Sequence, residues 1–328
     1  MMDASVFDER VRAAREASWK NFGRRIRFYV PSFMPYRAEQ VKRGFAAFPS
    51  ISITGNDCAL KCKHCQGRLL RTMIAARSAD DLLRTFEELH REEAVGCLVS
   101  GGCGLDGAVP LEPFVDVIAE AKGKFGLKIV IHTGIVSDDV AEKLGKARVD
   151  AVMIDVIGSD ETIHEVYGLN RKVEDYDASL AALEREGVPT VPHILVGLHY
   201  GKLKGELEAL KMAARHRPSA IIVIGLTPLR GTPMEFCSPA SPRDVVFVIT
   251  EARRLMPQTP VALGCARPKG RLRKEMDVLA VHAGVNAIAY PDPRAVEVAQ
   301  GLSLDYDYSG LCCSQICEDL AVRWKAEK

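Results

Sequence analysis

Short apolar runs alternate with amphipathic stretches along most of the chain. Each run is rich in β-branched residues and ends at a glycine, a proline or a polar residue, which is typical of strands buried in a parallel sheet. Eight strands are predicted in this way, over residues 51–55, 96–102, 128–134, 151–158, 191–198, 220–228, 260–266 and 287–291.

Between these runs the apolar residues recur with the period of a helix. The stretch 78–92 begins at a serine followed by two acidic residues, which is a good helix start. The stretch 173–186 is followed by Gly-Val-Pro, which ends a helix. The stretch 245–255 is preceded by Ser241-Pro-Arg-Asp, which places proline at the first helical position.

Eight βα units over about 240 residues predict the α/β class and a (β/α)₈ TIM barrel. A doubly wound open sheet is the alternative, because periodicity does not distinguish the two. We expect three parts: a helical N-terminal extension over residues 1–47, the barrel over 48–300, and a cysteine-rich C-terminal tail over 301–328.

Composition narrows the class of protein. The 328 residues carry a net charge of +1, with 47% hydrophobic and 27% charged residues, which excludes a disordered chain, a fibre and a small disulfide-stapled module. No apolar run reaches the ~18–20 residues of a membrane span. Residues 1–19 are charged and have no apolar stretch, so we expect no signal peptide and a cytoplasmic location. The balanced charge indicates neither a nucleic-acid nor a membrane partner.

Ten cysteines are the unusual feature, and six of them fall in two groups. In a reducing compartment, clustered thiols bind metal or do chemistry more often than they form disulfides. The first group is Cys58, Cys62 and Cys65 and the second is Cys312, Cys313 and Cys317.

The first group has the spacing C-x3-C-x2-C and follows the first predicted strand. Three thiolates on one loop can hold three corners of a [4Fe–4S] cluster, which leaves one iron open for another ligand. Zinc is the alternative, although a structural zinc takes four ligands and only His64 stands close enough in sequence to help.

This motif, at the opening of a βα barrel, resembles the radical S-adenosylmethionine (SAM) superfamily. The resemblance implies that SAM chelates the open iron, and that electron transfer to SAM releases a 5′-deoxyadenosyl radical. It also implies that His64 packs on the adenine, at a position where the family usually has an aromatic residue. Ser100, Gly101 and Gly102 resemble the turn that meets the methionine amino group, with Cys103 in place of the family's glutamate.

Later segments resemble biotin synthase and its relatives over most of the barrel. The resemblance implies catalytic roles for His132 and Asp155, and cofactor contacts from Gly197, Leu198 and Thr227. The inner-strand cysteines that hold the second cluster of biotin synthase are absent here, so its [2Fe–2S] site is not expected.

Cys265 ends the seventh predicted strand, so it should face the barrel mouth, where βα loops build active sites. If the tail folds over the mouth, Cys265 with Cys312, Cys313 and Cys317 could hold a second, auxiliary [4Fe–4S] cluster, and Cys265 would then act in catalysis. Neighbouring cysteines fit one cube poorly, so one of Cys312 and Cys313 would be spare. A zinc site or an inert thiol patch is the alternative. The basic run 267–274 is predicted to be a solvated helix start.

A second cluster in a biotin-synthase-like barrel indicates sulfur insertion. The chain resembles the archaeal-type, two-protein lipoyl synthases. This resemblance implies an octanoyl chain on a lipoyl carrier protein or peptide as substrate. It also implies a second radical SAM subunit and an electron donor such as ferredoxin as partners. The alternatives are another biotin-synthase relative, such as a methylase or a C–C bond-forming enzyme of cofactor biosynthesis, and a non-enzymatic iron–sulfur or zinc scaffold.

Overall fold

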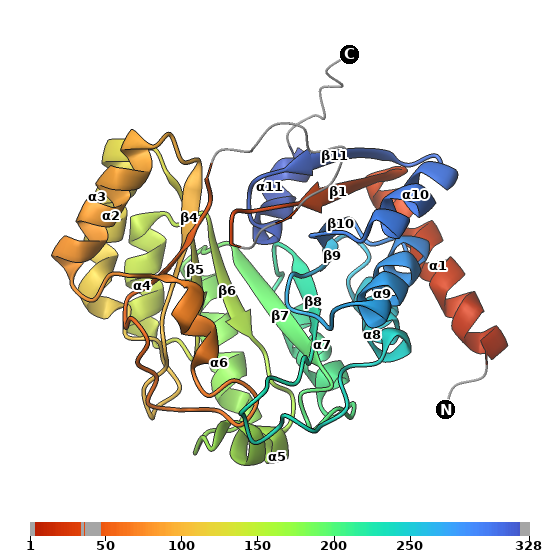
Figure 1. Ribbon diagram of the computed structural model, residues 1–328, viewed down its shortest axis with the longest axis horizontal. Helices are drawn as coiled ribbons and strands as arrows, with labels where there is room; N and C mark the ends of the chain where they lie inside the picture. Colours follow the sequence, from red (N-terminus) through yellow and green to blue (C-terminus); the bar gives the residue numbers. More distant parts are fainter. Residues whose placement is uncertain (1–3, 34–35, 37–46, 322–328) are drawn as a thin grey trace.

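One curled, all-parallel sheet organises the molecule in the computed structural model, which describes residues 4–33, 36 and 47–321 (Figure 1). Its two edge strands are not paired with each other in the described part of the chain, so the sheet is a half-barrel. In spatial order the strands are β11 (Asp305–Ser309), β1 (Arg25–Tyr29), β10 (Ala287–Ala289), β9 (Val261–Leu263), β8 (Ile221–Gly225), β7 (Thr190–Val196), β6 (Ala151–Asp155), β5 (Lys128–Thr133), β4 (Gly96–Ser100), β2 (Ser50–Ser52) and β3 (Ile74–Ala75).

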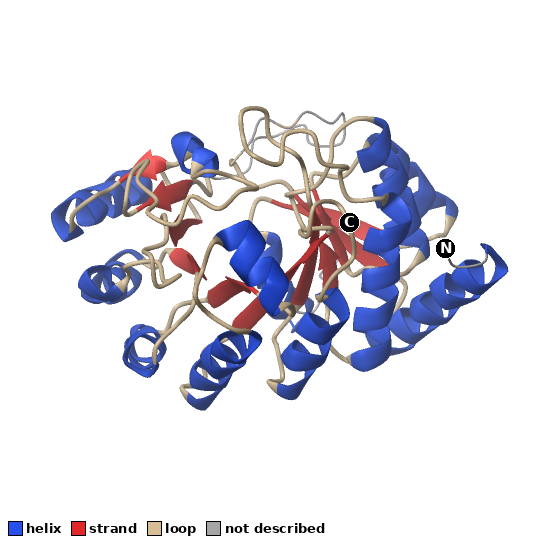
Figure 2. Ribbon diagram, turned by 90° about the horizontal axis from the view of Figure 1, so that it is seen from below, coloured by secondary structure: helices blue, strands red, loops and turns tan. Residues whose placement is uncertain are grey.

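Helices cover the convex, outer side of this sheet, as Figure 2 shows from the side at which the strands end. They are α1 (Ala4–Phe22), α2 (Ala79–Arg91), α3 (Val115–Phe125), α4 (Asp138–Ala147), α5 (Asp160–Thr162), α6 (Val173–Arg185), α7 (Glu206–Arg215), α8 (Pro242–Leu255), α9 (Arg271–His282) and α10 (Pro293–Gly301). The shorter turns are η1 (Arg68–Thr72), η2 (Glu112–Phe114), the π-helical η3 (Ile163–Tyr167) and η4 (Cys313–Gln315), and α11 (Ile316–Ala321) follows η4.

The predicted α/β fold is confirmed, and each of the eight predicted strands begins within one residue of an observed one. The helix predicted over 78–92 is α2, where the Ser78 side chain accepts a hydrogen bond from the Asp81 N–H at 3.1 Å. The helix predicted to start with proline ahead of 245–255 is α8, which begins at Pro242 as predicted, with Ser241 as its cap.

Three strands, β1, β3 and β11, lie outside the predicted eight. β1 lies in the segment predicted as a helical extension, of which α1 is the helical part, and β11 lies in the tail. Both alternate polar and apolar residues, which suits strands at one edge of a sheet, and they pair with each other in parallel. Residues 1–3, 34–35 and 37–46 of the predicted extension and 322–328 of the tail lie outside the described residues.

The inner face of the half-barrel is filled by the tail. After β11 the chain turns back, and Cys312, Cys313 and Ile316 pack against inward-facing residues of the central strands, Val130 on β5 and Met153 on β6 among them.

Helix α11 then runs toward the amino ends of the strands. Glu318 pairs with Lys128, the first residue of β5, and Asp319 pairs with Arg27 of β1 at 3.2 Å. The tail is therefore a plug inside the barrel rather than a cover over its mouth.

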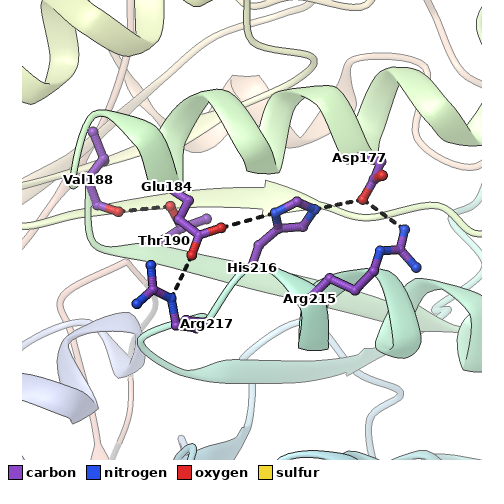
Figure 3. Close-up of polar contacts among 7 residues, drawn as sticks. All are labelled: Asp177, Glu184, Val188, Thr190, Arg215, His216 and Arg217. Atoms are coloured by element: carbon purple, nitrogen blue, oxygen red, sulfur yellow. Dashed lines mark hydrogen bonds and ion pairs between the residues drawn. The ribbon is translucent and has the colours of Figure 1, made fainter.

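A polar network joins α6 to the end of α7 on the outer face (Figure 3). His216 lies between two carboxylates, 2.7 Å from Asp177 and 3.2 Å from Glu184, and each carboxylate also pairs with an arginine, Arg215 or Arg217. This network fixes the spacing of two neighbouring outer helices.

None of the helices in the described residues has the length and apolar character needed to cross a membrane.

Candidate functional site

The first cysteine group lies on the loop between β2 and β3, at the carboxyl edge of the sheet. The sulfur atoms of Cys62 and Cys65 and a ring nitrogen of His64 lie within 4.8 Å of one another. The Cys58 sulfur lies 3.9 Å from the carbonyl oxygen of Cys103, which follows β4. The loop therefore brings Cys62, Cys65 and His64 to one place, and Cys58 lies near enough for its charge to act on Cys62.

The thiols of Cys62 and Cys65 have very different pKa values. A hydrogen bond from Cys62, followed by the effect of His64, lowers the pKa of Cys65 to about 4. The same hydrogen bond and burial raise the pKa of Cys62 well above its usual range. Cys65 is thus held as a thiolate, the form of cysteine that binds metal.

The turn after β4 locks onto this loop. The Gly102 N–H donates to the Thr54 hydroxyl at 2.7 Å, and the N–H groups of Ala59 and Leu60 donate to the carbonyl of Cys103 at 3.0 and 3.3 Å. A Cβ at residue 102 would lie only 2.1 Å from the Asp57 carbonyl oxygen, so glycine is required there.

The other residues of the predicted cofactor turn lie close by. The Cβ of a residue at position 101 would approach Ile53 and Thr54 at 3.1 Å, and the Ser100 hydroxyl donates to the carbonyl of His132 at 2.9 Å. Ser100 thus ties β4 to β5 at the edge where the loop begins.

On another side the cysteine loop packs against η3. The Lys63 N–H donates to the Val166 carbonyl at 2.8 Å, and the rings of His64 and Tyr167 lie 5.4 Å apart. His64 Nδ1 and the Tyr167 hydroxyl are both buried without a hydrogen-bond partner among the described residues. Two unpartnered polar atoms beside the thiols indicate that a ligand belongs there.

Tyr167 has no role in the sequence-based prediction. The available signal was its place in the Tyr-Gly segment, and only the packing of η3 on the cysteine loop reveals its position.

His132, Asp155 and His193 converge inside the barrel, the first two from near the ends of β5 and β6 and the third from the middle of β7. Their ligand atoms lie within 4.8 Å of one another. His132 Nε2 lies 3.5 Å from Asp155 Oδ1, and the two imidazole rings lie 5.4 Å apart, edge to face. Asp155 is paired with His193 across the β6–β7 ladder, which explains why the two side chains meet.

Charge on these three residues is unequal. Burial opposes ionisation of Asp155, but the charge of His132 and its hydrogen bond, with the charges of His193 and His64, together outweigh burial and lower the carboxyl pKa. Burial likewise opposes charge on His132, yet Asp155 raises its pKa above the usual value. Burial, together with the charge of His132, lowers the pKa of His193 to about 4, so His193 is neutral at pH 7.

The remaining predicted cofactor residues stand at the ends of β7 and β8. Gly197 adopts φ +76°, and its N–H donates to Glu206 at 2.8 Å. Leu198 is buried in the core against the outer helices, and Thr227 is half-buried just after β8.

The second cysteine group divides in two. Cys265, Cys312 and Cys313 lie in one apolar cluster on the inner side of the barrel. Hydrogen bonds from Cys313 and Ser314 lower the pKa of Cys312 to about 7. Cys317 is exposed, next to Glu318, which pairs with Lys128 at the amino end of β5. The structure therefore brings three of these four thiols together and leaves Cys317 apart.

The basic run after Cys265 is not uniformly solvated, so the prediction of a solvated helix start is wrong for Arg267. Its guanidinium is fully buried and forms two hydrogen bonds to Asp277, at 2.7 and 2.8 Å. Arg273 donates to the carbonyl of Cys265 at 3.2 Å. Both arginines hold the segment that carries Cys265.

Comparison with known proteins agrees with this geometry. Residues 52–229 match the profile of the radical SAM superfamily. Biotin synthase of Synechococcus elongatus is 26% identical over 273 residues, which cover 78% of this chain and 83% of that protein. Biotin synthase of Pseudomonas fluorescens is 26% identical and covers 74% of this chain and 69% of that protein.

Solved structures show the same fold. Methylornithine synthase superposes with a TM-score of 0.61 at 14% identity, covering 98% of this chain and 93% of that chain. The [FeFe]-hydrogenase maturase HydG of Carboxydothermus hydrogenoformans superposes with a TM-score of 0.61 at 16% identity, covering 98% of this chain and 72% of that chain.

Proposed function

The chain belongs to the radical SAM superfamily, and from that premise we propose that it is a sulfur-insertion enzyme, a component of a two-protein lipoyl synthase. The family implies a [4Fe–4S] cluster and SAM, and biotin synthase is among the relatives of this chain. The observation that carries the proposal is the gathering of Cys265, Cys312 and Cys313 inside the barrel, in addition to the thiols of the first loop.

The residues of the first loop fit a [4Fe–4S] cluster with one open iron. Cys58, Cys62 and Cys65 would hold it, because they are the three thiols of the loop and Cys65 is already a thiolate. The unpartnered Nδ1 of His64 and hydroxyl of Tyr167 offer polar contacts to SAM beside it. Gly102 lets the turn after β4 approach the backbone of the cysteine loop, so the turn lies directly beside the thiols.

When bound, the first cluster with SAM supplies a radical that removes hydrogen from an unactivated carbon, and a second cluster supplies sulfur. The chain's own residues have the tasks of positioning and protection. Asp155 and His132 lie 3.5 Å apart near the carboxyl ends of β6 and β5, where they would orient polar groups of SAM or substrate. The tail plug closes the barrel interior and excludes water from the reacting carbon.

Cys265, Cys312 and Cys313 would hold the second cluster and so act in catalysis. Their common environment is apolar, which keeps a reactive sulfide from solvent. The predicted ligand role of Cys317 has less support, because its side chain is exposed and set apart from the other three. Thiolate formation at Cys312 is favoured by its lowered pKa.

We further propose an octanoyl chain on a lipoyl carrier protein or peptide as substrate, a second radical SAM subunit as partner, and a ferredoxin-type electron donor. We also propose a cytoplasmic location. The support is the resemblance of the motifs to two-protein lipoyl synthases, together with the likeness of the chain to biotin synthase.

An anaerobic assay tests the proposal. The reconstituted chain is incubated with SAM, a reductant and an octanoyl-lysine peptide, with and without a candidate second subunit. The expected result is release of 5′-deoxyadenosine and methionine together with a peptide mass gain of sulfur. The matched control is Cys312→Ala, which should still cleave SAM but transfer no sulfur.

Other outcomes would overturn the proposal in different ways. SAM cleavage with a new C–C bond or methyl group in the product would assign the chain to another reaction class. A chain that binds iron or zinc without cleaving SAM would be a scaffold protein.

A further inference from the structure

The thiols inside the barrel do not suffice for a four-iron cluster, which has one ligand position on each iron. Cys317 is exposed and lies beside Glu318 rather than with the other thiols. Cys312 and Cys313 are neighbours in sequence, which makes it difficult for both to bind one cube. At least one iron therefore needs a ligand other than the gathered thiols.

We infer that His132 is that ligand, so that the second cluster is held by Cys265, which follows β9, by cysteines of the tail, and by one imidazole of β5. This inference rests on the proposed function, because it concerns the cluster proposed there as the sulfur source.

Placement on the strands carries the inference. Val130 of β5 and Met153 of β6 pack in the same cluster as Cys312 and Cys313. His132 is the next inward-facing residue after Val130, and it lies opposite Met153 in the ladder. Its imidazole therefore stands at the carboxyl-edge side of the tail thiols.

A carboxylate behind the imidazole is the arrangement that metal-binding histidines use. Such a histidine donates its second ring N–H to a carboxylate or carbonyl, which fixes the tautomer and makes the other nitrogen a better ligand. Asp155 Oδ1 lies 3.5 Å from His132 Nε2, and it is buried without a hydrogen bond of normal geometry. If Nε2 keeps the proton for Asp155, the lone pair of Nδ1 is free for iron.

His193 is the other histidine at this place, and its contacts assign it a different role. Its Nδ1 lies 3.1 Å from the carbonyl oxygen of Val191, on its own strand, and its ring packs edge to face against His132. His193 therefore restricts the rotation of the His132 ring, and it is a positioning residue.

The ligand type has an electronic consequence. A neutral imidazole replaces a negatively charged thiolate, so the cluster carries one negative charge less. Replacement of cysteine by histidine raises the reduction potential in other iron–sulfur centres, because adding an electron to a less negative cluster costs less free energy.

Pulsed EPR tests the inference on the full-length chain. The triple variant Cys58→Ala, Cys62→Ala, Cys65→Ala removes the first cluster, so that about four irons per chain should remain after reconstitution. The reduced cluster should show a strongly coupled nitrogen. Adding His132→Ala should abolish that coupling and lower the iron content, whereas adding His193→Ala should leave the coupling in place.

The variant His132→Cys tests whether the loss of iron in His132→Ala is caused by misfolding. It should restore the iron content, show no nitrogen coupling, and lower the reduction potential. A second cluster with no coupled nitrogen, or one whose nitrogen coupling survives His132→Ala, would overturn the inference and leave sulfur insertion intact. A triple variant without iron would refute the second cluster itself, and the inference with it.

Discussion

Gly102 and Cys58 are in direct backbone contact. A Cβ built on Gly102 would lie 2.6 Å from the Cα of Cys58 and 2.1 Å from the carbonyl oxygen of Asp57. The turn after β4 thus sets the position of the first thiol of the cysteine loop.

Gly102→Ala should therefore displace the loop. We expect most of the iron bound at Cys58, Cys62 and Cys65 to be lost, and overpacking to reduce stability by about 1–3 kcal/mol. The control is Gly123→Ala on α3, where an added Cβ meets no atom within 4 Å. That change should leave the iron content unaltered and add about 0.5–1 kcal/mol, because alanine is the better helix former. Iron analysis and thermal unfolding measure both, and full iron occupancy in Gly102→Ala would contradict the expectation.

The sheet was predictable because its signal is local. Each buried parallel strand is a continuous apolar run, so eight strands could be located from the sequence. β1 and β11 carry arginine, aspartate and tyrosine, and they become strands through pairing with each other and, for β1, with β10. Their charged side chains serve the tail plug, for example Arg27 with Asp307 at 2.8 Å. A contact between segments 280 residues apart leaves no local signal.

The candidate site divides in the same way. The first cysteine loop is a motif of fixed spacing, so its three thiols were predictable as one group. The meeting of His132, Asp155 and His193 depends on the register of three strands. The separation of Cys317 from Cys313 depends on how the tail turns inside the barrel. Sequence spacing suggested that Cys312, Cys313 and Cys317 act together, but in the structure Cys317 is exposed and the other two are buried.

Tyr167→Phe should weaken SAM binding without loss of iron. The hydroxyl is buried beside His64 and lacks a partner among the described residues, so a hydrogen bond to the cofactor would be lost. A net loss of about 1 kcal/mol corresponds to about fivefold weaker binding. Calorimetric titration of SAM into the reconstituted chain measures the change. Tyr306→Phe is the matched control, because that hydroxyl is engaged by Gln300 at 2.7 Å near the chain's other end. Equal affinities for both variants would refute the assignment.

Acid should loosen the contact between α6 and α7. Hydrogen bonds and charges of His216 and Arg215 lower the pKa of Asp177 against the effect of burial, and a hydrogen bond from Arg217 lowers the pKa of Glu184. A carboxyl whose pKa is lower in the folded state adds stability above its unfolded pKa, about 3.9 for Asp and 4.3 for Glu. That stability is lost as the pH falls through the folded pKa.

The double variant Asp177→Asn, Glu184→Gln should accordingly melt lower than the wild type at pH 7 and lose less on acidification from about pH 5 to pH 3. Thermal unfolding of the cluster-free chain across this range measures the difference. Asp116→Asn removes an exposed charge on α3 and serves as the control. Parallel pH profiles for the wild type and the double variant would show that the network in Figure 3 adds no stability.

The ion pair of Arg267 and Asp277 should be the most sensitive polar contact near the second cysteine group. Both side chains are fully buried, and Asp277 also accepts the N–H of Asp292 at 2.8 Å. Arg267 in turn donates to the carbonyl of Gly264 at 2.5 Å, directly before Cys265. Removing one partner of a buried pair leaves the other charge uncompensated, at a cost of about 3–5 kcal/mol.

We therefore expect Asp277→Asn to lower the free energy of unfolding by about that amount, measured by denaturant titration. The loss should be accompanied by a lower iron content at the second cysteine group, because the segment before Cys265 loses its anchor. Glu275→Gln makes the same chemical change two residues away, at an exposed position of α9, and should alter neither quantity. Equal stability of the two variants would mean that the guanidinium keeps its place through the carbonyls of Gly264 and Tyr290 alone.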